Sequence, residues 1–154
     1  MPIYVSHVTI DHVPKQQAID ISSAPKNIEF WIRVPTERKE ELQKAVGKPA
    51  GEWYRQDSDT QGAQQQQRLQ TSANGDGEWV RVHEFMYDIH TAGSPVQTFE
   101  LPVDLTRLNI TSHLVAFRIV DNWGHLNFTC LYRVRVHGYP PKRDLPIGER
   151  GEGV

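Results

Sequence analysis

The sequence predicts an all-β fold, an antiparallel β-sandwich or jelly roll that carries one short helix and a long flexible insertion. Three observations support this class. Six runs have the two-residue alternation of half-buried strands, clusters of Pro and Gly separate these runs, and one segment alone suits a helix. The chain has 154 residues, enough for a single domain with its own core.

The first two strands are expected near the N-terminus. Residues 3–13 (IYVSHVTIDHV) are rich in β-branched side chains, which suit a pleated surface. Residues 26–34 (KNIEFWIRV) alternate strictly, which predicts a strand buried on one face. Its buried face would hold Ile28, Phe30, Ile32 and Val34, and its other face Glu29, Trp31 and Arg33.

Four further strands are expected after residue 77. They are residues 78–89 (EWVRVHEFMYDI), 97–103 (QTFELPV), 113–120 (HLVAFRIV) and 130–138 (CLYRVRVHG). The second of these four places Phe99, Leu101 and Val103 on one side. In the last run Tyr132, Val134 and Val136 share one face, while Arg133 and Arg135 share the other.

The remaining segments are expected to lie outside the sheets. Thr36–Val46 (TERKEELQKAV) is the helical candidate, with Thr36 as a possible cap and charged residues in its first turns. Residues 47–77, approximately, are rich in Gln, Gly, Ser and Asp, so they have little apolar surface to bury and predict a flexible insertion within a domain spanning residues 1–140. Residues 141–154 are expected to form a disordered tail.

Composition disfavours several classes of function. The net charge is −2, whereas nucleic-acid binding needs concentrated Lys and Arg, so no nucleic-acid partner is expected. No apolar run approaches the roughly 20 residues of a membrane span. No secretory signal is visible after Met1. A membrane attachment or a lumenal location would therefore come from regions outside this chain.

No motif indicates catalysis, so we expect a binding module and not an enzyme. The nucleophile motif G-x-S-x-G and phosphate-cradling glycine loops are absent, and the carboxylates Asp57 and Asp59 fall in the insertion. The histidines are scattered without metal-ligand spacing, so neither a metal site nor a cofactor is expected. They are His7, His12, His83, His90, His113, His125 and His137.

The single cysteine and two sequons leave alternatives open. Cys130 is either a small buried hydrophobic residue or one half of a disulfide whose partner lies outside this chain. The triplets Asn109-Ile110-Thr111 and Asn127-Phe128-Thr129 are N-glycosylation sequons, which support a lumenal location only weakly because such triplets also arise by chance.

Two long motifs, in order, resemble the SUN-domain family of Sad1/UNC-like nuclear-envelope proteins. The first is VTIDHVP followed by ISSAPKNIEFW, and the second is NWGHLNFTCLYRVRVHG. The resemblance covers residues 3–31 and about 80–138. It implies a β-sandwich in the lumen between the two nuclear membranes that binds the C-terminal tails of KASH peptides. The family forms homotrimers, and the resulting LINC complex tethers the nucleus to the cytoskeleton.

The resemblance also implies a site for the free carboxylate of the peptide. The matching positions are His12, Ser23, Phe128 and Tyr132, and Ser, Tyr and imidazole can all donate hydrogen bonds to a carboxylate. Phe128 departs from the Tyr that is frequent in the family. The lost donor would weaken binding by about 1–3 kcal/mol. Taken singly, His12 could end a strand, Ser23 could cap a turn and Tyr132 could pack in the core.

Further parts of the family domain precede the segment that matches Ile3. They include a loop that holds a structural cation, the cysteine that pairs with the position of Cys130, and a hairpin lid. A coiled coil and a membrane span precede these parts. We expect Trp123, Gly124 and His125 to shape a turn. Two alternatives remain: a lectin-like carbohydrate-binding module that uses Trp53, Trp79 and Trp123, or a truncated fragment that binds nothing.

Overall fold

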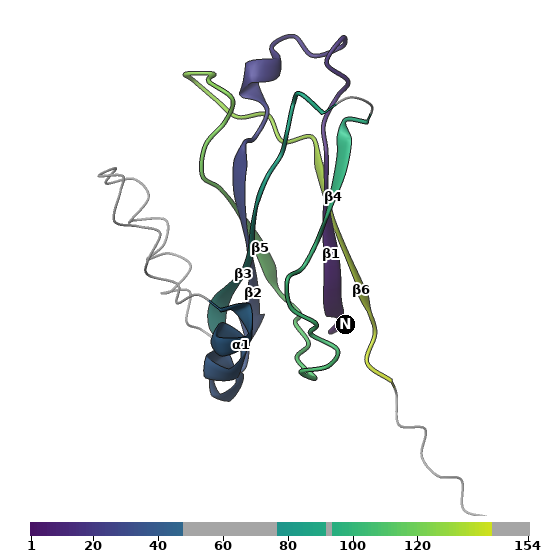
Figure 1. The fold of residues 1–154 in the computed structure, drawn as a ribbon, viewed down its shortest axis with the longest axis vertical. Helices are drawn as coiled ribbons and strands as arrows, with labels where there is room; N and C mark the ends of the chain where they lie inside the picture. Colours follow the sequence, from purple (N-terminus) through teal and green to yellow (C-terminus); the bar gives the residue numbers. More distant parts are fainter. Residues whose placement is uncertain (48–76, 92–93, 143–154) are drawn as a thin grey trace, which may run out of the picture.

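The strands form two three-stranded antiparallel sheets that face each other (Figure 1). The computed structural model describes residues 1–47, 77–91 and 94–142. One sheet has the order β4-β1-β6 and the other the order β3-β2-β5. The strands are β1 (Tyr4–Asp11), β2 (Asn27–Val34), β3 (Glu78–Met86), β4 (Val96–Glu100), β5 (Val115–Ile119) and β6 (Arg133–Tyr139). The all-β sandwich is therefore confirmed.

The core fills the space between the two sheets. Val8 and Ile10 on β1 and Ile28 and Phe30 on β2 are fully buried. Each such side chain contributes about 1.5–3 kcal/mol relative to exposure. The rings of Phe85 on β3 and Phe99 on β4 stack with centroids 4.1 Å apart, so this pair joins the two sheets directly. The inward positions of the alternating runs are thus the ones that hold the sandwich together.

The last strand begins later than its sequence pattern predicts. β6 starts at Arg133, so Cys130, Leu131 and Tyr132 precede it. The reason is the length of its neighbour, because the register of β1 against β6 ends with the pair Asp11 and Arg133. Residues 130–132 therefore belong to a connection, and Tyr132 is exposed instead of sharing the inner face with Val134 and Val136.

The predicted exposed face of β2 is wrong at two positions. Glu29 and Trp31 are both only 3% exposed. The Glu29 carboxylate accepts hydrogen bonds from the indole N–H of Trp31 and from the guanidinium groups of Arg81 and Arg118. These contacts satisfy the charge, which allows a carboxylate to be buried on a face that alternation alone assigns to solvent.

The helical segment lies at one end of the sandwich (Figure 1). A 3₁₀ turn at Thr36–Arg38 leads into α1 (Lys39–Val46). Thr36 lies inside the 3₁₀ turn, so its predicted capping role is wrong, and Leu42 is the buried anchor of the helix. Gly47 ends the helix with φ +75°, a left-handed conformation that favours glycine.

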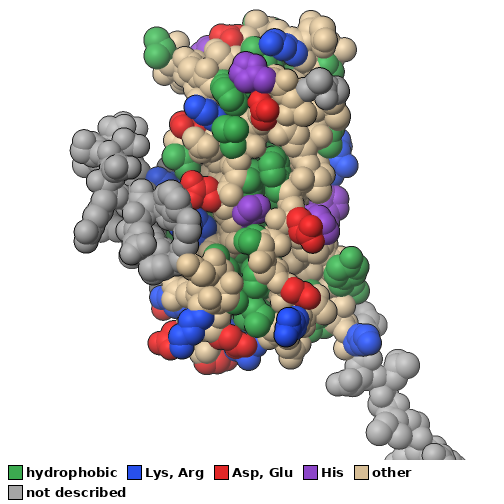
Figure 2. All heavy atoms as spheres, viewed as in Figure 1, with side chains coloured by type: hydrophobic (Ala, Val, Ile, Leu, Met, Phe, Trp, Pro, Cys, Tyr) green, Lys and Arg blue, Asp and Glu red, His purple; other side chains and the backbone are tan. Residues whose placement is uncertain are grey.

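The predicted flexible insertion and tail fall mainly outside the described residues, at 48–76 and 143–154. On the described surface, acidic and basic side chains are interspersed over the face in Figure 2. Three connections meet at the end of the sandwich opposite α1, namely residues 12–26, the described residues 87–91 and 94–95, and residues 120–132 (Figure 1). This end contains the residues that the resemblance singles out.

Candidate functional site

Main-chain hydrogen bonds join the two sequence motifs at this end. The N–H of Trp123 donates to the carbonyl of Ala24 at 3.2 Å, and the N–H of His125 donates to that of Ser22 at 3.2 Å. The N–H of Cys130 donates to the carbonyl of Ser23 at 2.7 Å. Segments about a hundred residues apart in the chain therefore lie side by side. We call residues 122–130 the rim loop.

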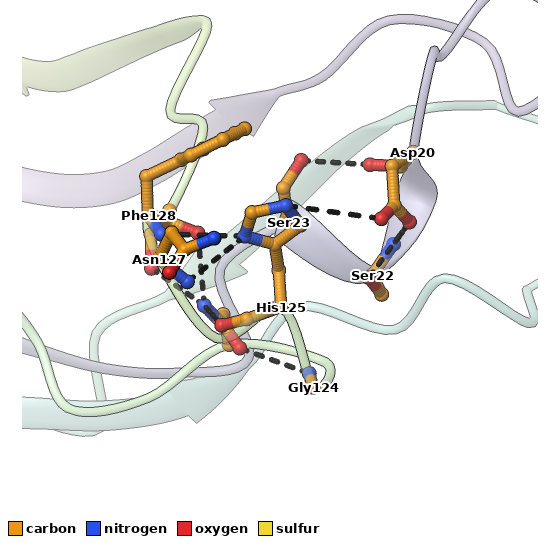
Figure 3. Close-up of polar contacts among 9 residues, drawn as sticks. Asp20, Ser22, Ser23, Gly124, His125, Asn127 and Phe128 are labelled. Atoms are coloured by element: carbon orange, nitrogen blue, oxygen red, sulfur yellow. Dashed lines mark hydrogen bonds and ion pairs between the residues drawn. The ribbon is translucent and has the colours of Figure 1, made fainter.

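The connection beside the rim loop is shaped by Asp20. Its Oδ1 accepts from the backbone N–H of Ser22 at 2.9 Å and from the hydroxyl of Ser22 at 2.7 Å (Figure 3). These two hydrogen bonds hold the pKa of the Asp20 carboxyl below its usual value. They also begin the 3₁₀ turn η1 (Ile21–Ser23), which presents the Ser22 and Ser23 carbonyls to the rim loop.

The rim loop is tied together by Asn122. Its side-chain nitrogen lies within hydrogen-bonding distance of the carbonyls of His125 and Phe128, at 2.9 and 3.1 Å, and of the hydroxyl of Thr129, at 3.1 Å. Its Oδ1 accepts from the N–H of Gly124, whose φ of +119° few other residues adopt. The loop thus has a defined shape without helix or strand.

His125 holds the tip of the rim loop. Its Nδ1 accepts from the backbone N–H groups of Asn127 and Phe128 at 3.2 and 3.3 Å (Figure 3). Nδ1 must be unprotonated to accept, so the ring hydrogen is on Nε2, 3.9 Å from Asp20 Oδ2. The imidazole also contacts the Phe128 ring, with centroids 3.9 Å apart. His125 is therefore a positioning residue for Phe128. The sequence predicts only that Trp123, Gly124 and His125 shape a turn, and all three lie in the rim loop.

Two of the four predicted site residues are buried and hydrogen-bonded locally. Ser23 is 4% exposed, and its hydroxyl donates to the carbonyl of Asp20 at 2.7 Å. His12 is 6% exposed, and its Nδ1 donates to the carbonyl of Val13 at 3.1 Å. With Nδ1 as donor, the neutral ring offers Nε2 as an acceptor, so donation to a carboxylate requires the doubly protonated ring.

The other two predicted residues are exposed. Phe128 is 54% exposed on the rim loop, and Tyr132 is 69% exposed just before β6. The rim loop brings Phe128 and Cys130 beside the Ser22–Ser23 segment. His12 makes its described ring contact with Tyr87, at 6.0 Å, and neither His12 nor Tyr132 has a described hydrogen bond to the other site residues. Convergence of all four side chains stays a prediction.

A hollow of about 290 Å³ lies at this end of the sandwich, and none of the four predicted site residues lines it. It is bounded by the chain immediately after His12, by Ile21 before Ser23 and by the connection between β3 and β4. Burial, with a smaller effect from the Asp11 charge, raises the pKa of the Tyr87 phenol in its wall. Its lining residues are Val13, Pro14, Lys15, Gln16, Ile21, Tyr87, Asp88, Ile89, His90, Thr91, Ser94 and Pro95.

The structure excludes one of the two interpretations of Cys130. The residue is exposed and has a free thiol, so the buried-hydrophobe interpretation is wrong. Pairing with a cysteine outside this chain stays a prediction. An exposed cysteine held by its backbone to Ser23 is accessible to such a partner.

Trp123, proposed for sugar stacking in the lectin alternative, is already engaged. Its indole N–H donates to the carbonyl of Tyr87 at 2.9 Å. The Lys26 ammonium lies 5.0 Å from its ring centroid, and the His90 ring meets it edge-on at 5.1 Å. These contacts disfavour a role for Trp123 as a sugar platform.

The described ranges, 1–47, 77–91 and 94–142, contain neither a cluster of metal-ligating side chains nor a membrane-spanning helix. No three His, Cys, Asp or Glu side chains there are grouped to hold a metal ion. None of the helices in that part of the chain is long and apolar enough to cross a membrane.

The fold and the tied loops define an antiparallel β-sandwich with a candidate site at one end. The family model described as "Sad1 / UNC-like C-terminal" matches residues 1–64 and 52–140. Because these matches cover most of the sequence, the chain belongs to this family, the SUN-domain family.

Several relatives match parts of the chain. SUN domain-containing protein 3 of Bos taurus is 42% identical over 65 residues, which are 42% of this chain and 17% of the relative. The human protein of that name is 42% identical over 67 residues, 44% of this chain and 17% of the relative. Klaroid protein of Drosophila melanogaster is 28% identical over 142 residues, 90% of this chain. The match covers 10% of Klaroid protein, so the chain spans only a small part of its relatives.

Proposed function

We propose that this chain is a peptide-binding module that grips the free carboxylate end of a KASH-type tail. By analogy with its family, it would act in the lumen of the nuclear envelope, within a homotrimer and as part of a LINC complex that tethers the nucleus to the cytoskeleton. The observation that carries the proposal is the hydrogen bond between the Cys130 N–H and the Ser23 carbonyl. It brings together the two motifs that carry the family resemblance.

The chemistry of the rim suits one end of an extended peptide. Tyr132 offers an exposed phenol that can donate to a carboxylate. Phe128 offers an exposed ring, steadied by His125, for apolar contact with the tail. A charge-assisted hydrogen bond to a carboxylate is about twice as strong as a neutral one, so a single phenol contributes measurably.

The buried members of the site require a rearrangement. Ser23 donates to the Asp20 carbonyl in the free chain, so its hydroxyl would have to rotate toward the ligand. His12 donates to the Val13 carbonyl through Nδ1, so this side chain would also have to exchange a local partner for the ligand. Binding should therefore reorganise the hydrogen bonds of Ser23 and His12, and this reorganisation is a distinctive consequence of the proposal.

The direct experiment compares two forms of one KASH-type tail peptide, one with a free terminal carboxylate and one amidated. Isothermal titration is expected to give binding to the free acid and at least a tenfold loss on amidation, equal to about 1.4 kcal/mol. Equal affinity for both peptides would contradict the carboxylate site.

Two tyrosines provide a matched pair of variants. Tyr132→Phe removes the proposed donor, whereas Tyr139→Phe removes a similarly exposed phenol on β6, with 61% exposure against 69%. We expect a weaker interaction with the free-acid peptide for Tyr132→Phe alone. The same loss in both variants would mean that Tyr132 has no specific role.

A further inference from the structure

The two sequons lie in different structural environments. Asn-x-Ser/Thr triplets are acceptors for N-linked glycans, which are bulky and hydrophilic and therefore require an accessible surface. One triplet begins at Asn109, in the connection between β4 and β5, and the other begins at Asn127 in the rim loop. Their accessibility in the folded chain differs.

The first sequon is built into the fold. Asn109 has φ +52°, and its Oδ1 accepts from the Tyr4 hydroxyl at 2.5 Å. The central residue, Ile110, is only 2% exposed, and its N–H donates to the Leu105 carbonyl at 3.0 Å. In the folded chain the backbone of this triplet is therefore held against the fold, which makes it less accessible to an enzyme than a triplet in an exposed loop.

The second sequon is displayed on the surface. Asn127, Phe128 and Thr129 are all exposed, and none lies in a helix or strand. Among the described residues, none hydrogen-bonds the Asn127 side chain, because the contact of this residue with His125 is through its backbone N–H. The Thr129 hydroxyl accepts from Asn122 and keeps its own hydrogen available.

We propose that Asn127 is an N-glycosylation site and that its glycan restricts access to the tail-binding rim. This inference rests on the proposed function, because it needs a lumenal location and a ligand at the rim. Asn127 directly precedes Phe128, and His125 Nδ1 holds the backbone N–H groups of both. A glycan on Asn127 is thus anchored on the same rigid turn as the apolar rim residue (Figure 3).

The modification is a group transfer from a lipid-diphosphate-linked oligosaccharide. Asn127 Nδ2 forms a bond to C1 of the first sugar, and the bond between C1 and the diphosphate oxygen breaks. The lipid diphosphate leaves with the bonding electron pair, and the amide nitrogen loses one proton. No oxidation or reduction takes place.

The site is tested on the full-length protein isolated from its own cells. Peptide-N-glycosidase in heavy-oxygen water converts a glycosylated asparagine to an ¹⁸O-labelled aspartate, which mass mapping detects. We expect the label at position 127 and not at 109. Thr129→Ala should abolish it, while Thr129→Ser and Asn109→Gln should preserve it. An unmodified Asn127 in the isolated protein overturns the proposal.

The effect on the ligand is measured with the free-acid tail peptide on the native protein. Removal of the glycan is expected to raise affinity by about fivefold or more, roughly 1 kcal/mol. Because the glycosidase leaves an aspartate at this position, Thr129→Ala provides a second comparison that keeps Asn127. Unchanged affinity in both would overturn the access role. A labelled site on a protein that binds the tail in neither state would contradict the proposed function while supporting the modification site.

Discussion

The body of the sandwich and its rim loop differ in how their polar and aromatic side chains are buried and paired. In the body, Glu29 is 3% exposed and both of its oxygens are occupied, with Arg81 at Oε1 and Arg118 and Trp31 at Oε2. In and just after the rim loop, large apolar or aromatic side chains face solvent, with Leu126 97% and Tyr132 69% exposed. Side chains in the body of the sandwich are paired with one another and stabilise the fold, whereas large side chains at the rim are exposed to solvent.

The body contains two carboxylates, Asp11 and Glu29, that each pair with two arginines. Asp11 accepts from Arg133 and Arg135 through Oδ2, while its buried Oδ1 has no partner. The arginines beside Asp11 have side chains 57% and 42% exposed, whereas the side chains of Arg81 and Arg118 are 8% and 11% exposed. The Glu29 cluster should therefore matter more for stability than the Asp11 cluster.

The largest expected effect is that of Glu29→Ala. Removing one partner of a buried ion pair leaves Arg81 buried without its nearest carboxylate, which costs about 3–5 kcal/mol of the free energy of unfolding. Urea denaturation would measure this loss. The matched control is Glu84→Ala, because that carboxylate lies 3.7 Å from Arg81 but is 40% exposed. We expect the control to cost less than about 1 kcal/mol. Similar losses in both would remove the distinction between buried and exposed partners.

Asp11 gives the next effect, which depends on pH. Burial opposes ionisation of this carboxyl, but hydrogen bonds from Arg135 and Arg133, together with their positive charges, outweigh it and hold its pKa below the usual value. A lowered folded pKa adds stability above the unfolded value of about 4, and this stability is lost as pH falls through the folded pKa. Asp11→Asn should therefore destabilise the domain at neutral pH and approach the wild type in acid.

Thermal melts between neutral and acidic pH would test this convergence. Glu100→Gln, an exposed carboxylate on β4 of the same sheet, is the control. Its difference from the wild type should stay small throughout the range. A difference between Asp11→Asn and wild type that grew toward acid would have the opposite sign to this account.

A smaller stability effect, about 0.5–1.5 kcal/mol, is expected for His125→Ala, because two backbone N–H groups lose their acceptor. Affinity for the tail peptide should fall as well, since the rim loop is no longer held. His125→Asn places an amide oxygen near the position of Nδ1 and should restore much of both properties. Failure of Asn to perform better than Ala would indicate that ring contact with Phe128, and not the hydrogen bonds, sets the loop.

The smallest effect on stability is expected for Phe128→Tyr, since the side chain is exposed. If the added phenol reaches the carboxylate, affinity for the free-acid tail should rise by about tenfold, or about 1.4 kcal/mol, which is close to the lower end of the range of about 1.5–3 kcal/mol for one hydrogen bond to a charged group. Titration with the free-acid and amidated peptides would measure it. A gain that was equal for both peptides would mean that the new hydroxyl contacts something other than the carboxylate.

Local pattern predicted much of the fold. Alternation and β-branched content predicted a run at each strand of the two sheets, because successive side chains along a strand point to opposite faces. The pattern gave no account of Glu29 and Trp31, since their burial depends on partners from β3 and β5. It also placed Cys130 in a strand, because a strand's end depends on where its neighbour stops. The order β4-β1-β6 likewise joins distant segments that periodicity cannot pair.

For the candidate site, too, the sequence predicted some features and the structure alone showed others. The motifs predicted its residues, but not that Ser23 donates to Asp20 or that His125 holds the loop, since both depend on three-dimensional contacts. The sequons looked equivalent along the chain. In the structure they differ, because the central residue Ile110 is buried and Asn109 accepts from Tyr4, whereas Phe128 is exposed and the Asn127 contact with His125 is through the backbone.

The central claim is that residues distant in the chain form one binding site for the terminal carboxylate of a peptide. Amide chemical-shift mapping of the ¹⁵N-labelled chain, titrated with the free-acid and amidated tails, tests it most directly. Shifts that differ between the two peptides should concentrate in residues 12–26 and 122–132. Differences confined to β6 and the outer face around Asp11, with Ser23 and Tyr132 unperturbed, would contradict the account.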